Sequence, residues 1–265
     1  MTLIKNVFKI LAVTALFSSA NVFAADFLVN TTINDSNHDA LGSNGTGWKY
    51  EIDKMDVQWA DSGLITVDIY TNFVGHNGKN GSGRYGHGNI VLGDLLIGTK
   101  GESNPYDYAF VLSDKDRNKD YSRDYSNGTW DKHWDKQGTF TEIGSTLTSK
   151  DYHGKYSSTA SGEVMAGTTK GSGTQSNWSV DNYGRYSGKT DKISFSFNVN
   201  GIDAFQNASQ LAFSWAMSCA NDVVDGVVNV DRPTSVPEPT TLLLMLLALG
   251  FMAKSRSNKS NDFSA

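Results

Sequence analysis

Apolar and polar residues alternate along most of the chain between residues 25 and 230. A period of two is that of a β-strand with one buried face. The clearest alternating segments are residues 64–70, 106–112, 193–199 and 211–219. In residues 48–59 the alternation changes phase near Asp53 and Lys54, which predicts a β-bulge or tight turn there.

The order and spacing of these segments predict an all-β fold for residues 25–230. The segments are short, and Gly, Ser, Asn and Asp separate them. We expect a single antiparallel β-sandwich, with a jelly roll as a variant. Residues 114–190 are polar and contain many aromatic residues. Part of this region must be strand, because a structureless loop of that length is rare in a compact domain.

The N-terminus has the pattern of a secretory signal peptide over residues 1–24. Lys5 and Lys9 supply the basic start, and an apolar stretch of about 11 residues follows. Such a helix is too short to span a bilayer of about 30 Å. We expect export by the Sec machinery and cleavage between Ala24 and Ala25.

The C-terminus combines a proline-containing linker, residues 231–239, with an apolar segment, residues 240–253. The apolar segment has 14 residues, which gives a helix of about 21 Å. It predicts a short transmembrane helix, although a full span needs about 20 residues. Residues 254–265 form a polar, cytoplasmic tail, whose basic residues orient the helix in the inner membrane. These residues are Lys254, Arg256 and Lys259.

The composition excludes some classes of function. Residues 25–236 contain 18 Lys and Arg against 26 Asp and Glu, a net charge of −8. An acidic body without a basic cluster does not fit a nucleic-acid binder. Cys219 is the one cysteine, so no intrachain disulfide forms, and its strand position favours a buried residue over intermolecular pairing or a nucleophile.

No motif for nucleophilic, zinc or phosphate chemistry occurs, so we expect a protein without enzymatic activity and without a required cofactor. Calcium is the one metal with a candidate site, because oxygen ligands occur at alternate positions of a loop. The candidate ligands are Asp114, Asp116, Asn118 and Asp120. Lys119 stands where an EF-hand has glycine, and the alternative is a solvated turn of mixed charge. His76 and His87 border a glycine-rich segment, where surface histidines are an alternative to a metal pair.

Trp130 and Trp134 form a candidate platform for a glycan. They lie in "WDKHWDK", where two exposed indoles can contact the apolar faces of sugar rings. The alternative is that these indoles cover the core or pair across strands.

The C-terminal segment resembles the PEP-CTERM sorting signal of Gram-negative bacteria. The residues that carry the resemblance are Val236, Pro237, Glu238 and Pro239, followed by the apolar segment and basic residues. The resemblance implies processing by exosortase, a membrane-embedded cysteine protease. It also implies a precursor anchored in the inner membrane and a mature protein at the cell surface or outside the cell.

The body more weakly resembles exosortase-dependent surface proteins, through Gly93-Asp94-Leu95 and a Trp215…Cys219 segment followed by Asn221 and Asp222. An ion site at Asn221, Asp222 and Asp225 and a plain turn are the alternatives there.

The family resemblance implies association with extracellular polysaccharide in a biofilm matrix. A carbohydrate-binding module or adhesin is the second hypothesis, and a secreted hydrolase is the third.

Overall fold

The computed structural model describes residues 27–36, 50–73, 90–101, 106–117, 133–153, 162–181, 190–232, 244 and 247–251. The chain divides into two compact units, Met1–Asp231 and Arg232–Ala265. In the second unit, residues 244 and 247–251 are helical. No helix in the described ranges is long and apolar enough to cross a bilayer, so the transmembrane helix over residues 240–253 stays a prediction. The predicted signal peptide, residues 1–24, lies outside the described residues.

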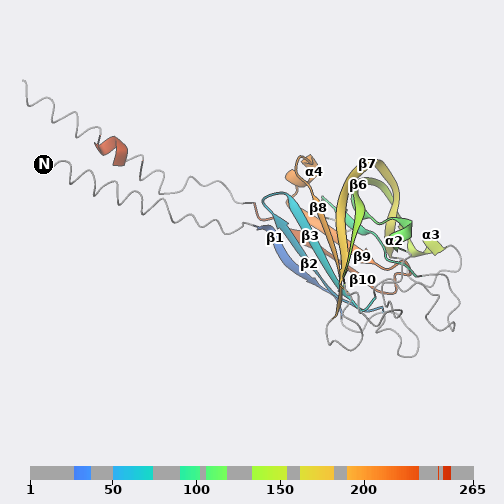
Figure 1. Ribbon diagram of the computed structural model, residues 1–265. Coiled ribbons are helices and arrows are strands. Elements are labelled where there is room, and N and C mark those ends of the chain that lie inside the picture. The colour runs from blue at the N-terminus through green and yellow to red at the C-terminus, as the bar shows by residue number, and fades with distance from the viewer. Residues whose placement is uncertain are drawn as a thin grey trace, which may run out of the picture. The chain divides into compact units, whose positions relative to one another are not determined.

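The described strands of the first unit form one antiparallel sheet (Figure 1). The order across the sheet is β1-β2-β3-β8-β7-β6-β5-β4-β9-β10. The strands are β1 Phe27–Asn34, β2 Ile52–Ala60, β3 Leu64–Thr71, β4 Leu95–Gly98, β5 Tyr108–Val111, β6 His133–Thr148, β7 Glu163–Asp181, β8 Asp191–Asn198, β9 Gln210–Ala216 and β10 Val223–Asn229. Short helices connect some of them: α2 Asp114–Arg117, α3 Ser149–His153 and α4 Asp203–Gln206.

The all-β, antiparallel prediction is confirmed, but the described strands do not form the two packed sheets of the expected sandwich. The single sheet curves until it is nearly barrel-shaped (Figure 1). The alternation in the sequence reports which side of each strand is buried, and both architectures bury one side. It therefore does not distinguish a sandwich from a curled sheet.

The two outermost strands, β1 and β10, come close to closing the sheet. The backbone N–H of Asp231, just after β10, donates to the carbonyl oxygen of Leu28 in β1 at 2.8 Å. A Cβ built on Gly226 would lie 2.8 Å from Cγ2 of Ile33. Both contacts fit one antiparallel alignment of β10 beside β1. The two ends of the folded sheet, near Leu28 and Asp231, therefore lie side by side.

The inner face of the sheet holds the main hydrophobic core, as the alternation predicts. Ile193, Phe195 and Phe197 of β8 are buried and pair with inward residues of β3. Aromatic rings fill the centre, with the rings of Phe140 and Phe197 stacked at a centroid distance of 4.5 Å. The expected phase change is also confirmed, because the β2–β3 register shifts between Ile52 and Lys54.

Strands β6 and β7 are longer than the others and bend together (Figure 1). The register shifts between Phe140 and Glu142 of β6, whose partners in β7 are Thr174 and Lys170. Within the extra residues of β7, Gly171 and Gly173 have φ values of 82° and 63°, which glycine adopts at little cost. Beyond this bend lies a segment that we name the distal hairpin, residues 142–148 paired with residues 163–170.

The distal hairpin packs against the sheet through two small clusters separate from the main core. Val164 and Met165 contact a cluster with Val91, Ala216 and Ala220. Ile143 belongs to another cluster, with Leu96, Tyr106, Ala109 and Ala212. The hairpin therefore covers part of β4, β5 and β9.

Candidate functional site

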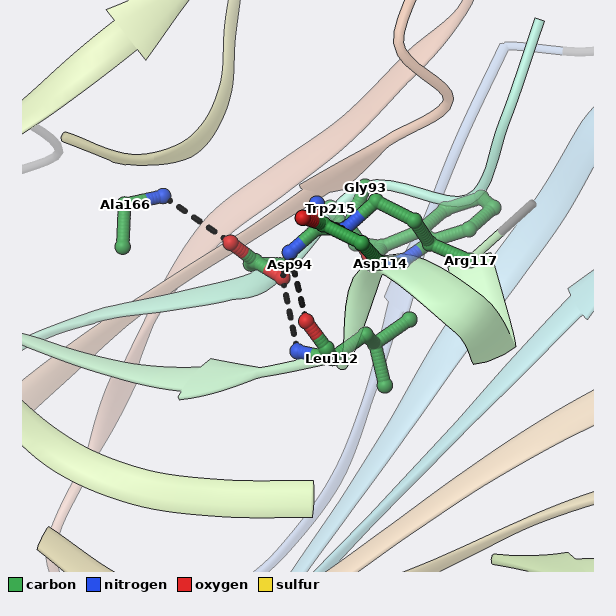
Figure 2. A network of polar contacts seen from close by, with 7 residues as sticks. All are labelled: Gly93, Asp94, Leu112, Asp114, Arg117, Ala166 and Trp215. Atoms are coloured by element: carbon green, nitrogen blue, oxygen red, sulfur yellow. Dashed lines mark hydrogen bonds and ion pairs between the residues drawn. The ribbon is translucent and has the colours of Figure 1, made fainter.

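A buried ion pair lies where β4, the end of β5 and the distal hairpin meet (Figure 2). Asp94 precedes β4, and Arg117 is the last residue of α2. An Nη2–Oδ1 distance of 2.9 Å joins the two side chains, which are 1% and 6% exposed. We name Asp94, Arg117, Leu112 and Ala166 the Asp94 network.

Each oxygen of the Asp94 carboxylate accepts hydrogen bonds within this network. The backbone N–H of Leu112 donates to Oδ1 at 2.9 Å, and that of Ala166 donates to Oδ2 at 3.0 Å. Arg117 Nη2 also donates to the carbonyl oxygen of Leu112 at 2.7 Å. The backbone N–H of Asp94 donates to the carbonyl oxygen of Val164 at 3.0 Å. Backbone and side chain of Asp94 thus bind the edge of β7 in the way that a neighbouring strand would.

Burial raises the pKa of the Asp94 carboxyl, while the Arg117 guanidinium and the two backbone N–H groups oppose that increase. All the hydrogen bonds of the carboxylate are directed to the protein itself. The arrangement therefore suits a structural role, joining three elements, better than the binding of a ligand or a metal.

Gly93 lets the chain approach closely at this point. A Cβ there would lie 2.0 Å from the carbonyl oxygen of Ala216 and 2.6 Å from that of Val164. The indole Nε1 of Trp215 donates to the carbonyl oxygen of Gly93 at 3.3 Å. The Gly93-Asp94 and Trp215 segments, which carried the resemblance of the body, therefore meet in space.

The Asp222 segment forms a turn connected to β2. The backbone N–H of Ile52 donates to Asp222 Oδ2 at 2.7 Å, and that of Val223 donates to Oδ1 at 3.0 Å. These bonds favour the turn over the ion site at Asn221, Asp222 and Asp225. Cys219 is buried, and burial raises the pKa of its thiol to about 11. This setting favours the structural interpretation of Cys219 over the nucleophile.

The calcium candidate stays a prediction. The side chain of Asp114 is 97% exposed, and its Oδ1 lies 3.6 Å from Arg117 Nε. The side chain of Asp116 and all of Asn118 and Asp120 lie outside what the structure describes. Across the described side chains, no group of three or more His, Cys, Asp or Glu is placed to hold a metal ion.

The glycan platform also stays a prediction. Trp130 lies outside the described residues, and Trp134 is in β6 without a described side chain. His76 and His87 likewise lie outside the described ranges.

The outer surface of the sheet carries uncharged polar residues that sequence analysis did not single out. On six adjacent strands, cross-strand partners carry amide or hydroxyl side chains, and we name this set the neutral row. Its members are Asn30, Gln58, Thr66, Ser196, Asn177 and Gln137. No single segment contains more than one of them, so only the strand order brings them together.

Charged residues lie beside the neutral row and neutralise one another. Lys54 Nζ lies 2.7 Å from Asp56 Oδ2, and this hydrogen bond raises the pKa of Lys54. Lys192 Nζ lies 3.3 Å from Asp68 and 3.6 Å from Asp181. The acidic and basic side chains on this part of the surface therefore form local pairs.

Comparison with known families locates the functional signal in the second unit. Residues 235–259 match the family model of the PEP-CTERM protein-sorting motif. The match contains Val236, Pro237, Glu238 and Pro239 and the basic residues Lys254, Arg256 and Lys259. No curated protein and no solved structure matches the chain. The resemblance of the tail is therefore confirmed, and the motif supports an exported, exosortase-sorted surface protein with a membrane-anchored precursor.

Proposed function

Starting from this PEP-CTERM sorting signal, we propose that the body is a non-enzymatic component of the cell surface or extracellular matrix. We further propose that exosortase releases it from the inner membrane and that it associates with extracellular polysaccharide. The observation that carries the proposal is the match of residues 235–259 to the sorting motif. Its support is that the folded unit ends at Asp231, so that cleavage near Pro237–Pro239 leaves the sheet whole.

Deleting the exosortase of the host tests this function. The expected result is a larger species retained in the membrane, because residues after the sorting motif remain attached. Intact-mass spectrometry and fractionation measure both changes. A variant with Glu238→Ala serves as the matched test within the chain. An unchanged mass and location after the deletion would refute the proposal.

A second candidate function is that of a carbohydrate-binding module or adhesin. The neutral row favours it, because amides and hydroxyls recognise sugar hydroxyls without selecting for charge. The indoles of Trp130 and Trp134, in the predicted glycan platform, would supply apolar contact to sugar rings. A glycan array tests it, with Gln58→Ala and Asn177→Ala for the neutral row and Trp130→Ala and Trp134→Ala for the platform. Equal binding by all variants, or none by the unmodified protein, would exclude this candidate.

A further inference from the structure

The end of the sheet from which the tail emerges carries exposed apolar side chains. Phe27 opens β1, and it pairs with Ala60 at the end of β2. Ala60 and Leu64 border the tight turn between β2 and β3, in which the Gly63 N–H donates to the Ala60 carbonyl oxygen at 2.8 Å. Phe27 is 41% exposed and Leu64 is 42% exposed. We name Phe27, Ala60 and Leu64 the apolar row.

The apolar row lies on the outer surface of the sheet. Its neighbours Trp59 and Ile65 point into the core, and strand side chains alternate between the two faces. Isolated exposed apolar residues are ordinary on soluble proteins. Here, however, the exposed Phe27 and Leu64 flank the partly buried Ala60 on three adjacent strands, next to the point where the chain leaves the folded unit.

The covalent connection limits how far this end of the sheet can move from a membrane that holds the tail. The backbone N–H of Asp231 donates a hydrogen bond to the carbonyl oxygen of Leu28, the neighbour of Phe27. Eight residues, 232–239, separate Asp231 from the apolar segment that begins at residue 240. Eight extended residues span at most about 28 Å. While the tail holds the precursor in the bilayer, the apolar row therefore cannot move far from the lipid surface.

The polarity of the outer surface changes with distance from this end. The apolar row comes first on β1, β2 and β3, and the exposed Asn198 of β8 pairs with Leu64 at its border. The next outward row on these four strands is part of the neutral row. Ion-paired residues such as Lys54 and Asp56 follow at greater distance. This sequence of apolar, uncharged and charged side chains matches the change from the lipid headgroups to water.

We propose that, in the membrane-anchored precursor, Phe27, Ala60 and Leu64 dock onto the headgroup region of the bilayer that holds the tail. The proposal rests on the anchoring that the sorting motif supports. Docking orients the folded unit with its tail-exit end toward the membrane, where exosortase acts. Asp61, exposed in the β2–β3 turn, and Asp231 limit the contact to a shallow depth. With the exposed Arg232 beside Asp231, these three side chains carry a net charge of −1, which predicts that zwitterionic lipid is preferred to anionic lipid.

The test uses the full-length precursor with single engineered cysteines. Cys219 is buried, so an exposed cysteine can be labelled selectively with an environment-sensitive fluorophore. Leu64→Cys reports on the apolar row, and Phe27→Cys repeats the measurement if the first variant folds poorly. Val227→Cys is the matched control, because Val227 is similarly exposed, at 45%. Val227 follows Gly226, which adjoins Ile33 near the other end of β1.

The labelled precursors are reconstituted in phosphatidylcholine vesicles that contain a lipid-phase quencher. We expect a blue shift at position 64 and roughly twofold more quenching there than at position 227. Adding anionic lipid reduces both effects. Equal quenching at the two positions in vesicles that carry the protein overturns the docking alone.

Two further outcomes distinguish docking from loss of the anchor and from self-association. Failure of the precursor to float with the vesicles overturns both the docking and the anchoring on which the proposed function rests. A blue shift that occurs without vesicles and increases with protein concentration assigns the apolar row to contact between copies of the chain and overturns the docking.

Discussion

Replacing Asp94 with alanine removes the acceptor around which the Asp94 network is built. The backbone N–H groups of Leu112 and Ala166 lose their partner, and each buried, unsatisfied donor costs about 1–3 kcal/mol. The buried Arg117 guanidinium also loses its counter-ion, and breaking a buried pair costs about 3–5 kcal/mol. Because these costs overlap and the hairpin can relax, we expect a total loss of about 5 kcal/mol in unfolding free energy.

Urea denaturation of the mature protein measures this loss. With a slope of about 2.5 kcal/mol/M, the midpoint of Asp94→Ala falls by about 2 M. Arg117→Met is the matched partner, since it removes the cation and keeps most of the side-chain volume. The double variant should be less destabilised than the sum of the single variants, because with both charged groups removed neither is left buried without its counter-ion. A midpoint change equivalent to less than about 1 kcal/mol, or additivity within about 0.5 kcal/mol, would refute the argument.

Further outcomes follow from the surroundings of single residues. Gly93→Ala should lower the free energy of unfolding by about 3 kcal/mol, because the new Cβ meets two backbone carbonyl oxygens. Gly201→Ala, strained only by its positive φ, should lower it by about 1 kcal/mol. Thermal unfolding of the two variants measures the difference. Alkylation of folded Cys219 at pH 8 should be at least about 100-fold slower than in urea, because burial shields the thiol and raises its pKa from 9.0 to about 11. Lys170→Ala should change stability by less than about 0.5 kcal/mol, since its pair with Glu142 is exposed.

Sequence alternation predicted the local part of the fold because it depends on neighbours along the chain. Ile193, Phe195 and Phe197 are buried as their spacing requires, and the register shift occurs beside Asp53. The bend of β7 was not predicted. Residues 167–175 of β7 are exposed and rich in Gly, Ser and Thr, so they lack the apolar alternation that identifies a strand. Their pairing with β6 stabilises them as a strand in spite of that composition.

The sequence indicated the Asp94 network less clearly than it indicated the strands. Asp94 lies between the apolar residues 90–92 and 95–97, and a lone acid in such a setting is rarely buried without a partner. That pattern predicts a partner without identifying it. Arg117 is 23 residues away and Ala166 is 72 residues away. Arg117 lies within the segment of the calcium candidate, and the structure joins it to Asp94.

The two kinds of functional signal in this chain differ in how they are encoded. The sorting motif is a continuous segment, residues 235–259, and its features are present before any folding. A binding surface on the sheet is instead assembled from residues that lie far apart in the sequence. Gln58 and Asn177 of the neutral row are brought onto one surface only when β3 and β8 pair between their strands. The destination of the protein can therefore be derived from the sequence, whereas a ligand of its body must be sought by testing surfaces that exist only after folding.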